Sequence, residues 1–97
     1  MTTKTIVQVS VSTNDIKRAN RDCNPVSMAV ARVFGLDEHF IQAQRHGILV
    51  FTYDDSIESV WNIDDNSQLS EFMDSWDFHQ LGHDVELNEF TFTITKK

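Results

Sequence analysis

Acidic side chains are the residues whose number and placement could carry most of the chemistry of this chain. From His46 to Thr95 the sequence holds eleven Asp and Glu residues and not one Lys or Arg. Residues 1–45 instead carry a small positive balance, and the whole chain has a formal net charge of −7. A field of single sign repels itself, so natural surfaces usually intersperse both charges. The pattern has two explanations. The acidic residues over 46–95 either serve only to keep the protein soluble or form a surface that binds a basic partner.

The candidate partner-binding residues come from two turns, the start of one predicted strand and one predicted helix. They are Asp54, Asp55, Glu58, Asp64, Asp65, Glu71, Asp74 and Asp77. The last three recur at a spacing that places them near one another on a helix, where like charges repel. Removing them is therefore expected to leave folding unharmed. Turn formation and helix capping are the competing explanation for the two Asp-Asp pairs.

A metal site is the alternative chemistry. His79 and His83 stand four residues apart, the spacing that places two imidazoles on one helical face for Zn²⁺, and Asp84 would add an oxygen ligand. Gly82 lies between the two histidines, however, and no Glu follows the first of them. These three residues are thus weak metal candidates, no residue is assigned as catalytic, and no cofactor is expected.

The single cysteine, Cys23, precedes an Asn-Pro helix start. A thiolate at a helix N-terminus is activated, but the neighbouring Asp22 opposes ionisation and the sequence offers no base. Cys23 is therefore expected to be inert, and one cysteine excludes an internal disulfide. Aromatic residues could form a binding surface, although core packing is the default expectation for each of them: Phe51, Tyr53, Trp61 and Trp76.

Periodicity predicts the element order β-α-β-β-(β)-α-β. The expected elements are a strand over 5–12, a short helical turn over 15–19, a helix over 25–34, a hairpin of strands over 39–45 and 48–53, a fourth strand or a bent continuation of the third over 57–63, a helix through Leu69, Phe72, Met73 and Trp76, and a strand over 89–95. Asn24 and Gly35 are the expected caps of the helix over 25–34, whose apolar face is Val26, Ala29, Val30, Val33 and Phe34.

The order indicates an α+β fold in one domain spanning 1–97, with an antiparallel-rich sheet and two helices on one face. It is also compatible with a ferredoxin-like split βαβ arrangement. The longest apolar run, residues 48–51, is far too short to span a bilayer, and no secretory signal is visible. We therefore expect a cytoplasmic protein that does not enter membranes. Its few bases are scattered, which argues against direct nucleic-acid binding.

Two stretches resemble small, mostly uncharacterised proteins of bacteriophages and other mobile elements. One is Asp22-Cys23-Asn24-Pro25-Val26-Ser27-Met28-Ala29. The other is Phe72-Met73-Asp74-Ser75-Trp76-Asp77 followed by Val85-Glu86-Leu87-Asn88-Glu89-Phe90-Thr91-Phe92, a helix ending in aromatic-Asp and a Phe-x-Phe strand. The resemblance implies a one-domain α+β fold and no enzyme activity. In size and charge alone, the chain is similar to anti-CRISPR and anti-restriction proteins.

The leading hypothesis is a non-enzymatic interaction module, of the phage-inhibitor type, that blocks a basic nucleic-acid-binding surface on a host protein. One alternative is a metal-dependent or acid/base enzyme using His79, His83 and Asp84. Another is an acidic partner in a toxin–antitoxin or scaffold pair. The expected oligomeric state is a monomer or a small homo-oligomer.

Overall fold

The computed structural model describes residues 5–19, 23–64 and 67–97 and has an α+β fold. The elements are β1 (Ile6–Val11), α1 (Thr13–Arg18), α2 (Pro25–Phe34), the 3₁₀ helix η1 (Glu38–Phe40), β2 (Ile41–Ala43), β3 (Gly47–Phe51), β4 (Ile57–Ile63), α3 (Ser67–Gln80) and β5 (Phe90–Lys96). The predicted antiparallel-rich sheet and the helix over 25–34 are confirmed. Residues 57–63 form a separate strand. Of the strand expected over 39–45, residues 41–43 form β2, whereas residues 39–40 belong to η1 and β2 ends at Ala43.

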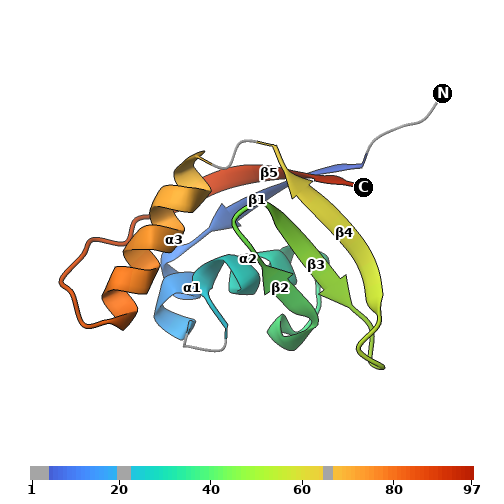
Figure 1. The fold of residues 1–97 in the computed structure, drawn as a ribbon, viewed down its shortest axis with the longest axis horizontal. Coiled ribbons are helices and arrows are strands. Elements are labelled where there is room, and N and C mark those ends of the chain that lie inside the picture. Colours follow the sequence, from blue (N-terminus) through green and yellow to red (C-terminus); the bar gives the residue numbers. More distant parts are fainter. Residues whose placement is uncertain (1–4, 20–22, 65–66) are drawn as a thin grey trace.

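The five strands form one sheet in the order β1-β5-β4-β3-β2. Each described pair of neighbours is antiparallel. In a ferredoxin-like split βαβ arrangement a single strand separates the two strands that a helix joins, whereas β1 and β2 lie at opposite edges of this sheet, so that alternative is wrong. Strands β2, β3 and β4 follow one another as a meander, and β5 returns after α3 to lie between β4 and β1. Figure 1 shows the sheet curling around α2.

Helix α2 carries the chain from one edge of the sheet to the other across the inside of this curl (Figure 1). Its N-cap Asn24 accepts a hydrogen bond from the Ser27 backbone N–H at 2.8 Å, and Pro25 occupies the first turn. Gly35 ends the helix in the left-handed region at φ 68°, as the sequence predicts. Every residue over 25–31 is buried because the helix is enclosed on all sides. Val33 was expected in the core but lies beyond this enclosed part and is exposed.

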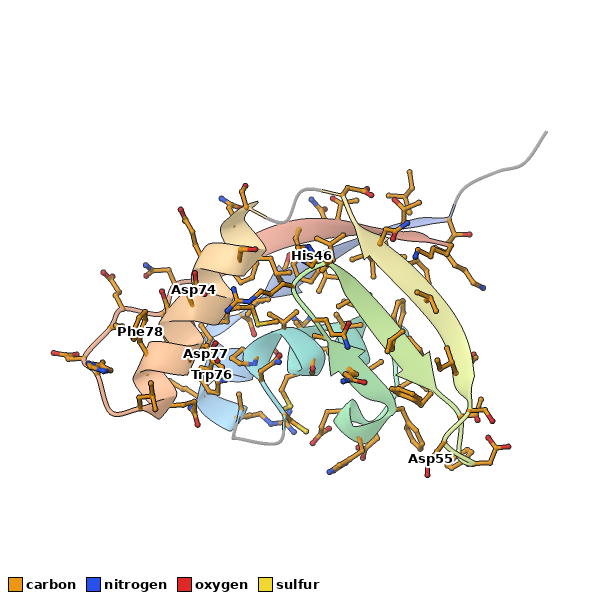
Figure 2. All side chains as sticks on the ribbon, viewed as in Figure 1. His46, Asp55, Asp74, Trp76, Asp77 and Phe78 are labelled. Carbon is orange, nitrogen blue, oxygen red and sulfur yellow. The ribbon has the colours of Figure 1, made fainter. Side chains whose placement is uncertain are left out.

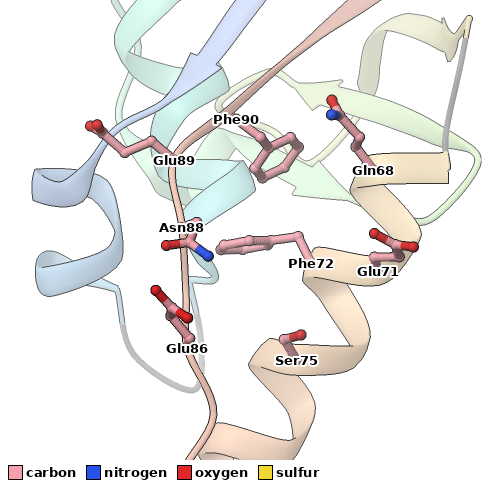
Figure 3. Close-up of a pocket in the computed structure, with 8 residues that line it drawn as sticks. All are labelled: Gln68, Glu71, Phe72, Ser75, Glu86, Asn88, Glu89 and Phe90. Carbon is pink, nitrogen blue, oxygen red and sulfur yellow. The ribbon is translucent and has the colours of Figure 1, made fainter.

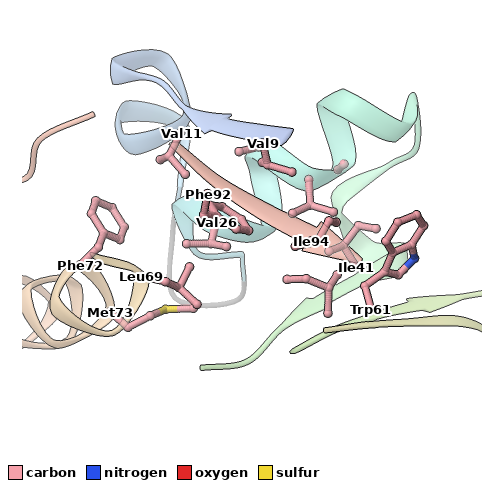
Figure 4. Close-up of a cluster of buried hydrophobic side chains, with 14 of the residues drawn as sticks. Val9, Val11, Val26, Ile41, Trp61, Leu69, Phe72, Met73, Phe92 and Ile94 are labelled. Atoms are coloured by element: carbon pink, nitrogen blue, oxygen red, sulfur yellow. The ribbon is translucent and has the colours of Figure 1, made fainter. Parts of the chain in front are cut away.

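The core joins the inner face of the sheet to α2 and α3 (Figure 4). Helix α3 contributes its four predicted apolar residues, Leu69, Phe72, Met73 and Trp76, all of which are buried. They pack beside Val26 of α2 and Phe92 of β5 in the same cluster. The opposite face of α3 is therefore left for polar and acidic side chains.

Candidate protein-binding surface

The candidate acids do not form one surface. Asp54, Asp55 and Glu58 belong to the β3–β4 hairpin, whereas Glu71, Asp74 and Asp77 belong to α3. Figure 2 shows Asp55 at one end of the long axis of the molecule and Asp74 with Asp77 toward the other. These residues share their charge and lie near one another in the sequence, but neither property determines their distance in the fold. Asp65 lies outside the described residues.

In the sequence Asp64 lies between these two groups, just after β4. Its two carboxylate oxygens accept hydrogen bonds from the hydroxyl of Thr95 on β5, at 2.9 and 2.8 Å. This contact fastens the end of β4 to its neighbouring strand. Asp64 therefore has a structural role within the sheet.

Two of the three acids on α3 are neutralised within the protein. The guanidinium of Arg45, in the β2–β3 turn, lies 2.7 Å from Asp74 Oδ1 and 3.3 Å from Asp77 Oδ2. The same guanidinium donates a hydrogen bond to the Ser70 carbonyl at 3.1 Å. The expectation that these acids only repel one another is wrong, because a base twenty-nine residues earlier than Asp74 folds back onto them. Removing Asp74 or Asp77 breaks a contact between the sheet and α3.

Glu71 lies on a different flank of α3 and lines a shallow groove. The groove separates α3 from the extended segment before β5 and has a volume of about 230 Å³ (Figure 3). Its lining residues are Gln68, Glu71, Phe72, Ser75, Glu86, Asn88, Glu89 and Phe90. The rings of Phe72 and Phe90 meet at a centroid distance of 4.8 Å. The groove therefore combines carboxylates, hydroxyl and amide groups with two aromatic rings.

The carboxylates of this groove differ in their partners. Glu89 accepts a hydrogen bond from the Thr13 backbone N–H at 2.8 Å and so caps the start of α1. Glu71 and Glu86 form no ion pair with Lys or Arg in the part of the chain that the structure describes. Two carboxylates beside aromatic rings suit an ammonium or guanidinium group, which is attracted by both. We call this site the acidic groove.

Asp54 and Asp55 lie in the turn between β3 and β4, which several hydrogen bonds stabilise. The Thr52 backbone N–H donates to the Ser56 carbonyl at 2.8 Å, and the Asp55 N–H donates to the Thr52 carbonyl at 3.1 Å. The carboxylate of Asp54 accepts hydrogen bonds from the Thr52 hydroxyl and the Ser56 N–H. Hydrogen bonds from Thr52 and Ser56 lower the pKa of Asp54. Turn formation thus accounts for this Asp-Asp pair, as the competing explanation held.

The weak metal candidates are not brought together. Helix α3 ends at Gln80, and Gly82 at φ 91° turns the chain so that the His83 N–H bonds the Phe78 carbonyl at 3.0 Å. The ring of His79 then stacks on Trp76, whereas that of His83 meets Phe78 edge-on. Their helical spacing therefore does not give a shared face, and Asp84 does not complete a set with them. Within the described ranges, the group of three potential ligands is Asp37, Glu38 and His39, where Asp37 already caps η1.

Cys23 and the aromatic candidates divide between core and surface. Cys23 is buried at the entry to α2, consistent with its predicted inertness. Trp61 and Trp76 are in the core, and the Trp61 indole N–H donates to the Ser59 hydroxyl at 3.0 Å. Tyr53 departs from the core expectation, because 93% of it is exposed. Its position beside Asp54 and Asp55, in a turn, was the signal in the sequence.

Comparisons with protein families, with curated proteins and with solved structures found no match to this chain. Among the described residues, the structure contains no helix with the length and apolar character needed to cross a membrane.

Proposed function

We propose that this protein is a non-enzymatic interaction module that binds a basic surface of another protein. The observation that carries the proposal is the acidic groove, in which Glu71 and Glu86 flank the rings of Phe72 and Phe90 without a Lys or Arg in its lining. An Arg or Lys side chain of a partner would gain a carboxylate contact and a ring contact together. The surrounding acids would steer the two proteins toward each other.

A nucleic-acid-binding protein is the partner class that suits this chemistry best. Such proteins cluster Lys and Arg where they contact phosphates. A small acidic domain seated on that cluster would occupy it and exclude the nucleic acid. The proposal therefore includes inhibition by charge mimicry, which is the role expected of a phage-type inhibitor. The enzyme alternative gains no support, since His79, His83 and Asp84 do not converge.

The acidic groove can be tested before any partner is identified. The probe is the tripeptide acetyl-Gly-Arg-Gly-amide, titrated into ¹⁵N-labelled protein while backbone amide shifts are recorded by NMR. We expect weak, saturable binding that shifts resonances of residues 68–75 and 86–90. Acetyl-Gly-Gln-Gly-amide, which has a similar backbone and no charge, is the control peptide. Binding should weaken with added salt, because screening shortens to about 8 Å at physiological ionic strength.

Matched variants separate the groove from net charge. Glu71→Gln with Glu86→Gln removes two charges from the groove, whereas Asp55→Asn with Glu58→Gln removes two charges from the hairpin. The first pair should weaken Arg-peptide binding at least about fivefold, and the second pair less than about twofold, because surface charges beyond a Debye length are screened. Equal shifts with the Gln peptide, or equal losses in both variants, would contradict a specific cation site.

A further inference from the structure

The turn between β3 and β4 carries an exposed aromatic residue, and hydrogen bonds hold this turn in shape. Tyr53 lies in the five-residue connection between β3 and β4 and is the first of the three residues between Thr52 and Ser56. The hydrogen bonds of this connection define its shape, and the last of the three residues, Asp55, has φ 65°. Tyr53 as a residue is 93% exposed, and its ring meets the Phe40 ring of η1 edge-on, at a centroid distance of 5.0 Å. A side chain that is this exposed buries almost no apolar surface, so it contributes almost nothing to the stability of the core.

Other apolar side chains extend this exposed surface. Tyr53, Phe40, Phe51 and Leu36 line a shallow hollow of about 150 Å³ together with Thr52 and Glu58. Leu36 is 40% exposed, and Ile57, at the start of β4, is 57% exposed. We call Leu36, Phe40, Phe51, Tyr53 and Ile57 the hairpin-end patch. Exposed apolar groups that gather in this way mark interaction sites more often than single exposed residues do.

A β-bulge shapes this end of the sheet. Ile57 lies opposite Phe51 and Ser59 lies opposite Val50, so Glu58 is an extra residue in β4. A bulge bends the strand and redirects its side chains. Glu58 consequently lines the hollow at the end of the hairpin.

Acids border the patch. Asp37 and Glu38 immediately precede His39 and Phe40, and the other acids are Asp54, Asp55 and Glu58. Hydrogen bonds from the backbone N–H and the ring of His39 lower the pKa of Asp37, which keeps that carboxylate charged. No Lys or Arg occurs over residues 33–44 or 46–59. Lys96 lies with Leu36 and Glu58 in the adjoining hollow and marks the edge of the acidic border.

We propose that the hairpin-end patch is a second protein-binding surface, which inserts Tyr53 into an apolar pocket bordered by Lys and Arg on a partner protein. Tyr is among the residues that dominate binding energy when a partner buries them. The acidic border selects a basic partner, because like charges across an interface are strongly unfavourable. A second copy of this chain would place acid against acid, and nucleic acid or an anionic membrane would be repelled.

This inference shares one assumption with the proposed function, namely that the partner protein is basic. The hairpin-end patch and the acidic groove lie at different ends of the molecule, and Figure 2 shows Asp55 of the hairpin far from Phe78 of α3. Either site can therefore fail in its own test while the other holds.

The probe for the hairpin-end patch is a short helical peptide of Leu and Lys, with Leu on one face and Lys at its borders. Two matched peptides are the controls: one replaces each Lys by Glu, and the other replaces each Leu by Gln. We expect the Leu-Lys peptide to bind the full chain and to shift amide resonances of residues 36–40 and 51–58. Both control peptides should bind at least about tenfold more weakly, since each lacks one half of the complementarity.

Variants then assign the binding to Tyr53. Tyr53→Ala should lower the affinity for the Leu-Lys peptide at least about tenfold, as loss of a hot-spot residue does. Phe78→Ala removes another exposed aromatic side chain, 52% exposed and on α3, and should change binding less than about twofold. Any contact of the peptide's Lys side chains with the acidic groove is recognised separately, by shifts at residues 68–75 and 86–90 that Glu71→Gln with Glu86→Gln should reduce. Tyr53 is almost wholly solvated, so its variant is expected to fold, and urea unfolding of each variant checks this.

Three outcomes would overturn the inference. The first is binding of the Leu-Glu peptide as tight as that of the Leu-Lys peptide, which would show an apolar surface without charge selection. The second is binding that does not involve Tyr53. It would be shown by shifted resonances confined to the acidic groove, or by a Tyr53→Ala variant that binds the peptide like the wild type. The third is self-association of the chain that Tyr53→Ala abolishes, measured by sedimentation equilibrium, which would make a second copy the occupant.

Discussion

The Arg45 guanidinium lies 2.7 Å from the Asp74 carboxylate and joins the β2–β3 turn to the middle of α3. Helix α3 otherwise rests on its apolar face, so this contact fixes one of its polar flanks to the sheet. Arg45 also contacts Asp77 and the Ser70 carbonyl. One side chain thus spans about two turns of the helix, and part of the acidic character of α3 is balanced inside the protein.

Arg45→Gln is expected to lower the free energy of unfolding by about 1–2 kcal/mol. Exposed ion pairs contribute little each, and the bond to the Ser70 carbonyl adds a charge-assisted hydrogen bond. Urea unfolding monitored by circular dichroism measures the change. Lys17→Gln, on the exposed face of α1, is the control for formal charge and should cost less than about 0.5 kcal/mol. A double-mutant cycle with Asp74→Asn should give a coupling of roughly 0.5–1 kcal/mol, and zero coupling would show that the ion pair contributes nothing.

Asp15 is a buried carboxylate whose ionised form contributes to the stability of the folded protein. Its side chain is 8% exposed and lies 2.9 Å from Arg32, and it also accepts hydrogen bonds from the Ser12 N–H and hydroxyl. Burial by itself raises the pKa of Asp15. The hydrogen bonds from Arg32 and Ser12 outweigh burial, so the pKa lies below its ordinary value of 3.8.

A lowered folded-state pKa gives stability that is fully present above the unfolded-state value and is lost as the pH falls through the folded-state value. Stability of the wild type should therefore decline from about pH 5 downward, through 3.8 and below. Asp15→Asn should cost about 1–3 kcal/mol at pH 7 and should flatten this decline. Chemical unfolding at a series of pH values measures both effects. Asp84→Asn, an exposed control, should retain the wild-type slope, and an equally steep decline in Asp15→Asn would assign the acid limit to other carboxylates.

Local signals explain why some elements could be predicted from the sequence. The helix over 25–34 is bounded by an Asn-Pro start and a glycine end, and both caps form as expected. Strand β1 follows from the alternation of Val7, Val9 and Val11 with polar residues, and the last two are buried. These signals lie within a few residues of the structure that they determine.

Long-range contacts explain what the sequence did not reveal. The pairing of Arg45 with α3 joins residues that no local pattern connects, so the sequence alone predicts only repulsion among the α3 acids. The candidate acids are spread over two ends because β4 carries the chain from the hairpin toward α3. The two histidines do not share a helical face because α3 ends at Gln80, before His83. Gly82, which lies between them, was a sign in the sequence that the helix ends there. Tyr53 looked like the end of an apolar strand, whereas β3 stops at Phe51.

Asp55 is held in a backbone conformation that favours glycine. Its φ of 65° lies in the left-handed region, which costs an L-residue with a Cβ roughly 1–2 kcal/mol, although Asp tolerates it better than most. Asp55 is the last of the three residues between Thr52 and Ser56, where a left-handed residue closes the turn. Asp55→Gly is therefore expected to raise the free energy of unfolding by about 0.5–1 kcal/mol, after the greater entropy of glycine in the unfolded chain is subtracted.

The matched control is the neighbouring acid, which has a different role. The Asp54 carboxylate accepts hydrogen bonds from the Thr52 hydroxyl and the Ser56 N–H, so Asp54→Gly should lower stability while removing the same charge. Urea midpoints at constant m-value, measured for both variants at pH 7, distinguish backbone strain from charge. If both substitutions stabilise the protein equally, relief of acidic repulsion at the hairpin is the cause. If Asp55→Gly is neutral or destabilising, the left-handed conformation is not a source of strain in this turn.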